Sequence, residues 1–261
     1  MSAPRVAAVA GRFYPGHPVE LAALVDEFLA AATDVCGGVP KALIVPHAGY
    51  LFSGPVAGAA YAQIRGAPVE RVVMFGPAHR WSVAGLALPA TQTFETPLGP
   101  VPIDAQAAAR ALQYDFVETI DAAHLSEHAI EVQLPFLLRC LPQAFGLVPF
   151  VVGQATTAQV GQVLDALWGG PETLIVVSSD LSHFHDYDTA QFLDTATSAA
   201  IESLSPQGVH EGSACGRVAI QALLTAADQR GLAARTVDRR NSGDTAGGRD
   251  EVVGYGAYIF G

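Results

Sequence analysis

Short apolar runs that end in polar, titratable side chains recur along the chain. Residues 174–177 form one such run, and Ser178-Ser179-Asp180-Leu181-Ser182-His183 follows it directly. Two more runs are each followed by a histidine, residues 42–45 by His47 and residues 71–75 by His79. Short apolar runs, of which residues 174–177 are rich in β-branched side chains, predict strands that are buried on both faces. If the three strands are parallel neighbours, the three histidines converge at one edge of the sheet, where open α/β sheets place their ligands.

Segments with apolar residues at helical spacing alternate with the strands. Helices are expected over residues 18–31, 55–64, 104–112, 126–140, 157–168, 189–204 and 215–229, and further strands over 84–88, 116–120, 147–152, 234–239 and 252–260. This alternation predicts one α/β domain over residues 1–261, with a mostly parallel central sheet and helices on both faces.

Local signals refine several of these boundaries. Ser53 is expected to cap the helix that begins near Pro55, and Ser126 to cap the helix over residues 126–140. Pro135 is expected to kink that second helix, because it cannot donate to the carbonyl four residues earlier. Residues 241–248 are rich in glycine and small polar side chains, and we expect them to form a mobile loop.

Composition excludes several classes of function. The chain has 261 residues, of which half are hydrophobic, and its 25 acidic against 14 basic residues give a formal charge of −11. We expect no nucleic-acid partner, because no basic stripe is visible, and no membrane association, because the charge opposes anionic surfaces and no run is long enough to span a bilayer. The three cysteines, Cys36, Cys140 and Cys215, are odd in number and widely spaced, which fits a reducing compartment. We therefore expect a cytoplasmic protein.

Two imidazoles and one thiol are candidate metal ligands. His47 and His79 each lie just past a strand in a loop that contains proline, and neutral imidazole is a common ligand for Zn, Cu and Fe. Cys215 stands at an expected helix N-terminus, where the helix dipole lowers the pKa of a thiol. The alternatives are a histidine that only hydrogen-bonds near a strand end, and a cysteine that packs as a small apolar residue. We assign that packing role to Cys140.

Two polar clusters are candidates for proton transfer. Asp180 and His183 follow the same strand three residues apart, a spacing that can place a base beside the group that orients it. His128 and Glu131 are expected to share a helix face, whereas Glu127 is expected to be a solvated acid in the first turn of that helix. The other histidines, His124 included, are expected at the surface or in local hydrogen bonds. The chain has no GxGxxG fingerprint, Walker loop, HExxH motif or serine nucleophile elbow.

The order of the motifs resembles that of one family. The matching segments are Gly11-Arg12-Phe13-Tyr14-Pro15, Pro46-His47-Ala48-Gly49-Tyr50, Gly76-Pro77-Ala78-His79, Glu127-His128-Ala129-Ile130-Glu131, Ser178-Ser179-Asp180-Leu181-Ser182-His183, Cys215-Gly216, Ser242-Gly243-Asp244 and Val253-Gly254-Tyr255. In this set, which covers essentially the whole chain, the sequence is similar to the Memo family, whose bacterial and archaeal members are called AmmeMemoRadiSam system protein B.

The resemblance implies a fold and a site. The Memo family is similar to class III, LigB-type extradiol dioxygenases, which use non-haem Fe(II). Its metal position maps to His47, His79 and Cys215, and the surrounding polar residues map to His128, Asp180 and His183. Of these, His128 and His183 would occupy the acid–base positions of the dioxygenases. The thiolate departs from the dioxygenase pattern of two histidines and a carboxylate, and a softer ligand set of this kind also suits copper or zinc.

Three functions follow as alternatives. The first is a metal-binding protein, with iron as the leading metal, that oxidises a small metal-chelating substrate. The second is a non-catalytic module that uses the same cleft to bind a peptide or a radical-SAM partner protein. The third is a zinc or cysteine hydrolase built on the same residues. An apolar-rich chain is also compatible with a homodimer.

Overall fold

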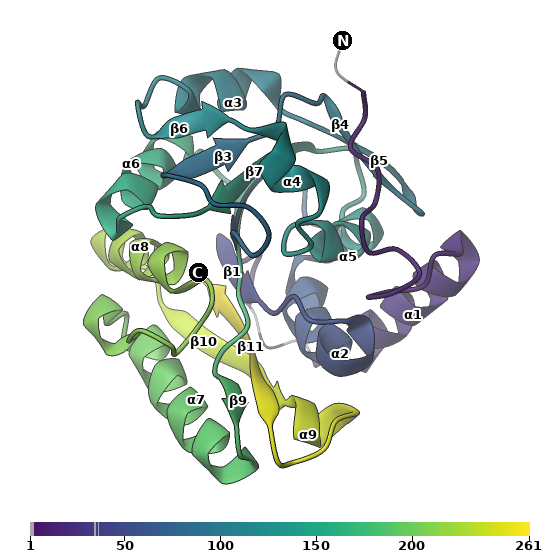
Figure 1. The fold of residues 1–261 in the computed structure, drawn as a ribbon, viewed down its shortest axis with the longest axis vertical. Coiled ribbons are helices and arrows are strands. Elements are labelled where there is room, and N and C mark those ends of the chain that lie inside the picture. Colours follow the sequence, from purple (N-terminus) through teal and green to yellow (C-terminus); the bar gives the residue numbers. More distant parts are fainter. Residues whose placement is uncertain (1–2, 34, 36) are drawn as a thin grey trace.

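The computed structural model describes residues 3–33, 35 and 37–261, so Cys36 lies outside the described residues. A mixed sheet runs through the molecule in the strand order β10-β11-β1-β8-β2-β7-β3-β6, and β9 pairs with β11 beside this path (Figure 1). The strands of this sheet are β1 (Ala42–Val45), β2 (Arg71–Pro77), β3 (Leu86–Leu88), β6 (Val117–Thr119), β7 (Gly146–Val152), β8 (Thr173–Ser178), β9 (His183–His185), β10 (Ala234–Asn241) and β11 (Val252–Phe260). β4 (Thr93–Thr96) and β5 (Gly99–Pro102) form a separate hairpin.

The centre of the sheet is parallel. β1 pairs with β8, β8 with β2 and β2 with β7, all in the parallel sense, whereas β11 and β3 join this centre in the antiparallel sense. Every residue of β1 and β8 is buried, as the continuous apolar runs predicted. The three apolar runs that end in histidine segments are therefore adjacent parallel strands, and the predicted fold class is confirmed.

Helices cover both faces of the sheet. They are α1 (Pro18–Ala31), α2 (Tyr50–Tyr61), α3 (Ala105–Ala111), α4 (Asp121–Leu125), α5 (Leu134–Cys140), α6 (Thr157–Leu167), α7 (Tyr187–Glu202), α8 (Arg217–Gln229) and α9 (Ser242–Thr245). Alternate residues of the strands belong to two buried clusters, one with α1, α2 and α5 and the other with α3, α6, α7 and α8. In Figure 1, α1, α2 and α5 lie to the right of the strands, and α6, α7 and α8 lie to the left. Each helix in the described residues is too short or too polar to cross a membrane.

The prediction of one helix over residues 126–140 is wrong for the first half of this segment. Ser126 ends α4 instead of starting a helix, residues 127–130 form a loop, and one 3₁₀ turn (Glu131–Gln133) leads into α5. Pro135 stands in the first turn of α5, where its missing N–H leaves no hydrogen bond unmade, so it starts a helix and kinks none. The loop that replaces the helix carries His128 towards the edge of the sheet.

Two further segments, at the start of α2 and around α9, depart from the sequence prediction in ways that the structure explains. α2 begins at Tyr50, because the Tyr50 amide and hydroxyl are tied to Phe13 and Val132 and this buried side chain holds the first turn in place. Ser53 is inside α2 and donates to the Ala48 carbonyl instead of capping. Within the segment 241–248, which was expected to be a loop, Ser242–Thr245 forms α9, whose capping box pairs Asn241 with Asp244.

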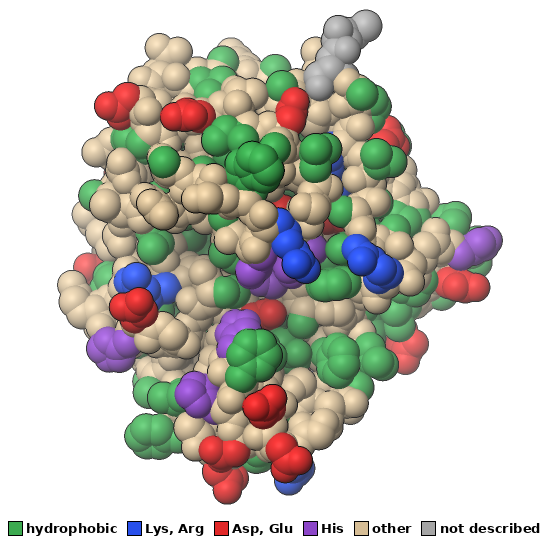
Figure 2. All heavy atoms as spheres, viewed as in Figure 1, with side chains coloured by type: hydrophobic (Ala, Val, Ile, Leu, Met, Phe, Trp, Pro, Cys, Tyr) green, Lys and Arg blue, Asp and Glu red, His purple; other side chains and the backbone are tan. Residues whose placement is uncertain are grey.

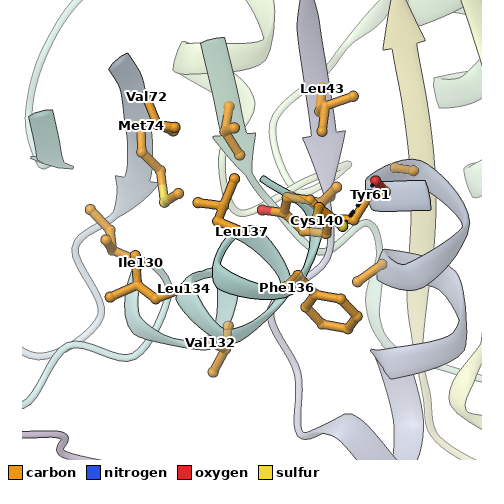
Figure 3. Close-up of a cluster of buried hydrophobic side chains, with 14 of the residues drawn as sticks. Leu43, Tyr61, Val72, Met74, Ile130, Val132, Leu134, Phe136, Leu137 and Cys140 are labelled. Atoms are coloured by element: carbon orange, nitrogen blue, oxygen red, sulfur yellow. Dashed lines mark hydrogen bonds between the residues drawn. The ribbon is translucent and has the colours of Figure 1, made fainter. Parts of the chain in front are cut away.

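Cys140 and His124 lie in the interior. Cys140 is 3% exposed, and its sulfur donates to the Tyr61 carbonyl at 3.2 Å among the apolar side chains of α5 and the strands, as expected for a packing role (Figure 3). His124 is only 2% exposed, so the surface position, one of its two expected roles, is wrong; it has the other role, a hydrogen bond, which joins its Nε2 to the Ala87 carbonyl at 3.1 Å. That carbonyl can only accept, so Nε2 carries the proton of the neutral ring.

Acid should destabilise the fold through His124. Burial lowers the pKa of His124 to about 4, against a smaller opposing effect of the Ala87 hydrogen bond. In the unfolded chain this ring gains a proton below about pH 6.5. As pH falls from about 6.5 to 4, protonation of the unfolded state alone should therefore remove up to about 3 kcal/mol of stability.

His124→Gln keeps a donor for Ala87 and cannot be protonated. Urea unfolding of wild type and variant between pH 4 and pH 7 should give a difference in unfolding free energy that favours the wild type increasingly as pH rises. His47 titrates in both proteins, so the difference isolates His124. A difference that is constant across this range would contradict the assignment.

Candidate metal centre

Three loops at the carboxyl ends of β1, β2 and β8 meet at one point. His47 lies two residues after β1, His79 lies two residues after β2, and Asp180 lies two residues after β8. Because these strands are parallel neighbours, their carboxyl ends lie at the same edge. Cys215 joins them from the segment just before α8. Figure 2 shows a group of histidine side chains, in purple, near the centre of this face.

The ligand atoms of His47, His79 and Cys215 lie within 4.8 Å of one another. Cys215 Sγ is 3.3 Å from His47 Nε2. In a tetrahedral zinc site, metal bonds of about 2.3 Å to sulfur and 2.0–2.1 Å to nitrogen separate the two ligand atoms by roughly 3.5 Å. The observed spacing therefore suits a metal ion between them.

Cys215 is held in place by the loop after β8. The Asp180 amide donates to Sγ at 3.2 Å, and the Cys215 amide donates to the Asp180 carbonyl at 3.3 Å. The next residue must be small, because a Cβ on Gly216 would stand 2.7 Å from the Ser179 side chain. Gly216 instead donates its amide to Ser179 Oγ at 2.8 Å. The Cys215-Gly216 pair thus allows close contact between the start of α8 and β8.

The tautomer of His47 follows from its neighbours. Ser178 Oγ donates its one proton to the Ala129 carbonyl at 2.6 Å and accepts from Gln133 Nε2 at 2.9 Å. Its remaining contact, to His47 Nδ1 at 2.9 Å, must therefore be accepted by the hydroxyl. His47 thus carries its proton on Nδ1, and the lone pair of Nε2 faces Cys215 Sγ.

Glu127 fixes the tautomer of His79 in the same way, with the ring proton on Nδ1. The carboxylate accepts from the His79 amide at 2.7 Å and lies 2.9 Å from His79 Nδ1. A carboxylate partner at Nδ1 keeps the proton there and leaves Nε2 free to bind a metal. Glu127 Oε1, the oxygen that lies next to His79 Nδ1, also accepts from the amides of His128 and Ala129, at 2.8 and 3.0 Å.

His79, Glu127 and His128 form a second group whose ligand atoms lie close together. In this group Glu127 Oε1 already accepts from three donors, two of them backbone amides, which leaves that oxygen no free lone pair for a cation. We therefore interpret the second group as a hydrogen-bonded support for the first.

The three residues predicted to take part in acid–base chemistry, His128, Asp180 and His183, lie in different positions relative to the candidate metal ligands. The ring of His128 is stacked on that of His79 with centroids 4.8 Å apart, and it lies 5.4 Å from that of His47. Asp180 is buried and accepts the His47 amide at 2.7 Å, so it positions the His47 loop. His183 lies on β9, its described ring contact is with Phe184, and it does not join the cluster of the His47, His79 and His128 rings, in which His79 and His128 are stacked and His47 is edge-on to both. Glu131 does not face His128, because it is buried against Arg5 and Tyr14.

Burial sets the charge states of the candidate ligands. It lowers the pKa of His47 to about 4, against an opposing effect of Asp180, so the ring is neutral at pH 7. Burial and, next, the Asp180 carboxylate raise the pKa of the Cys215 thiol to about 12. The expected lowering at the helix N-terminus is therefore wrong for the metal-free protein, because the thiolate is desolvated. Burial also raises the pKa of Glu127, but hydrogen bonds from His128 and His79 outweigh it and hold the pKa well below its usual range.

Sequence reasoning missed three supporting residues. Glu127 is 2% exposed and bonds two histidines, although it was expected to be a solvated acid. The only signal for this role in the sequence was that Glu127 directly precedes His128. Ser178 and Gln133 orient His47, and only the position of Ser178 at the end of a buried strand hints at its role. Nothing in the local sequence marks Gln133.

Comparisons with known proteins agree over nearly the whole chain. The sequence model of the family described as Memo-like protein matches residues 5–259. A MEMO1 family protein of Aquifex aeolicus is 35% identical, covering 98% of each chain. One of Methanosarcina barkeri is 34% identical and one of Sulfolobus acidocaldarius 31%, each covering 98% of this chain and 99% of the relative.

A solved structure shows a similar fold. The crystal structure of an uncharacterized Escherichia coli K12 protein has a TM-score of 0.54 and 15% sequence identity, and the match covers 84% of this chain and 98% of that one. At this identity the likeness concerns the fold alone. The family match and the relatives in bacteria and archaea, which align with this chain from end to end, show that the chain belongs to the Memo family.

Proposed function

We propose that His47, His79 and Cys215 bind one transition-metal ion, with Fe(II) as the leading metal and copper or zinc as alternatives. One observation carries this proposal. The hydrogen bonds to Ser178 and Glu127 leave a lone pair on Nε2 of His47 and a free Nε2 on His79, while Cys215 Sγ lies 3.3 Å from the first of these atoms. Metal-binding histidines regularly donate their other ring N–H to an oxygen atom in this way.

The donor set fits several soft or borderline metals. Two imidazoles and a thiolate suit iron, copper and zinc better than they suit Mg²⁺ or Ca²⁺, which prefer oxygen ligands. The Asp180 N–H that points at Sγ also stabilises a thiolate. A bound metal would displace the thiol proton outright.

A small cavity beside the third ligand favours a small substrate. It has a volume of about 220 Å³ and is lined by Cys215, Pro77, Gly153 and Arg217, among others. Pockets for drug-sized ligands are larger, about 300–1,000 Å³. We propose that the protein oxidises a small molecule that chelates the metal. When bound, Fe(II) would supply open coordination positions and one-electron chemistry with dioxygen.

The chain's own residues would then handle protons and orientation. His128 Nδ1 lies 3.3 Å from Glu127, and within the described residues its Nε2 has no hydrogen-bond partner. This Nε2 is the atom at which we propose that a substrate proton is taken up or returned. Asp180 holds the His47 loop through its backbone amide. A proton-transfer role for His183 stays a prediction, and its ring lies outside the cluster formed by the rings of His47, His79 and His128.

Metal stoichiometry tests the ligand set. Apoprotein titrated with Fe(II) under anaerobic conditions should bind one equivalent by elemental analysis, and Cys215→Ser should lose at least about tenfold in affinity, because a hydroxyl replaces the soft anionic ligand. Cys140→Ala is the matched control, since it removes a thiol that lies in the core. Equal loss in both variants, or no loss in Cys215→Ser, would contradict the assignment.

Oxygen uptake tests the proposed chemistry separately. With Fe(II) bound and a panel of catechols and other small chelators, the wild type should consume oxygen. His128→Gln should keep the metal and slow turnover by about 10²–10⁴-fold. If no member of the panel supports uptake, the oxidation proposal fails while metal binding stands. Metal-independent capture of a peptide or radical-SAM protein would then favour the non-catalytic module.

The support for His79 can be tested without turnover. Glu127→Gln keeps the shape of the side chain but loses the charge that holds the His79 proton at Nδ1, so the metal affinity should fall about 10–100-fold. Glu172→Gln, at the opposite end of β8, should bind metal like the wild type. The interpretation of Glu127 as a support is refuted if both variants bind Fe(II) equally well.

A further inference from the structure

An N-terminal strap, defined as residues 5–14, is tied to the protein interior by one buried arginine. Arg5 is 3% exposed, and its guanidinium contacts the Glu131 carboxylate. Its other donors reach two backbone carbonyls, that of His124 at 2.9 Å and that of Glu127 at 2.6 Å. A guanidinium has donors in a fixed fork, so these three contacts fix one another's positions.

Glu131 holds the rest of the strap by accepting hydrogen bonds from it. Its carboxylate accepts the amides of Ala8 and Val9 at 2.7 and 3.0 Å and the Tyr14 hydroxyl at 2.6 Å. The side chain is fully buried, and every hydrogen bond that it accepts within the described residues comes from the strap. A buried charge pair of this kind is costly to break in part, because each lost partner leaves a desolvated charge or donor. The strap is therefore expected to be held as a unit.

The strap also contacts residues 124–128, the turn that carries Glu127. Arg5 holds the carbonyls of His124 and Glu127, which both lie in this turn, and the Glu127 carboxylate in turn bonds His79. At the other end of the strap, the ring of Phe13 lies 4.8 Å from that of His128. The strap thus touches residues 124–128 at two separate points, although it lies more than a hundred residues away in sequence.

We propose that Arg5 and Glu131 are positioning residues of the metal centre, which they serve by fixing the turn that presents Glu127 to His79. This inference rests on the proposed metal site at His47, His79 and Cys215. Coupling between two sites is reciprocal. A strap that raises metal affinity by a given factor must itself be stabilised by the metal by the same factor.

A purely structural role predicts something else. In that case, loss of the Arg5 fork would lower global stability while the folded fraction bound metal normally. The two readouts that separate these roles are the metal affinity of the folded protein and the exchange rate of the Ala8 and Val9 amides, which donate to Glu131.

Arg5→Lys is the informative variant, because an ammonium keeps the charge beside Glu131 but cannot reproduce the fork to both carbonyls. Its affinity for Zn(II), measured by titration calorimetry at a temperature where circular dichroism shows it folded, should be at least about tenfold weaker than that of the wild type. Arg139→Lys is the matched control, since Arg139 forms its fork with Asp26 on the surface. It should bind Zn(II) like the wild type.

Hydrogen exchange of the wild type and of Arg5→Lys supplies a second test. In the wild type, saturating Zn(II) should slow exchange of the Ala8 and Val9 amides, and in Arg5→Lys the slowing should be smaller. Equal Zn(II) affinity of wild type and Arg5→Lys, or exchange at Ala8 and Val9 that Zn(II) leaves unchanged, would overturn the coupling while the metal site itself stands. A wild type that binds no metal would refute the site and the coupling together.

Discussion

The parallel register of β1, β8 and β2 is the constraint on which the site depends. Val45 pairs with Ser178, and Phe75 pairs with Val177, so the three strands end at nearly the same level. A polar residue of the site lies two positions after the last residue of each strand: His47 after β1, Asp180 after β8 and His79 after β2. A slip of one residue in either pairing would reverse which side chains face which cluster, because the side-chain period of a strand is two. The continuous burial of these strands on both faces therefore also fixes where their loops meet.

Three polar side chains at this edge are buried, and each of them is hydrogen-bonded by its neighbours. Glu127, Asp180 and Ser178 are all buried, and the two carboxylates accept backbone amides while the hydroxyl uses its one donor and both lone pairs. Desolvation of such groups without partners would cost several kcal/mol each. With partners, they hold two imidazoles in defined tautomers, which is why the arrangement suits a metal.

The sequence predicted the scaffold well because its signals are local. Continuous apolar runs and helical spacing place most of the strands and helices, and Asp104, the first residue of the helix expected over residues 104–112, caps α3. The loop at 127–130 was not predictable in this way, because its backbone is shaped by Arg5, which is far away in sequence. The same long-range contact explains why Glu127 looks like a solvated acid in the sequence and is a buried hydrogen-bonding centre in the structure. Residue chemistry and position made His47, His79 and Cys215 candidate metal ligands, and the resemblance to the Memo family assigned all three to one metal position.

The central claim is that two imidazole nitrogens and one sulfur share a single metal ion. X-ray absorption spectroscopy of the Zn(II)-loaded protein tests it most directly, because the nearest shell reports the ligand atoms themselves. We expect one sulfur at about 2.3 Å and two nitrogens at about 2.0–2.1 Å, with the sulfur contribution lost in Cys215→Ser. A shell of only oxygen and nitrogen in the wild type, or a sulfur signal that persists in Cys215→Ser, would contradict the account.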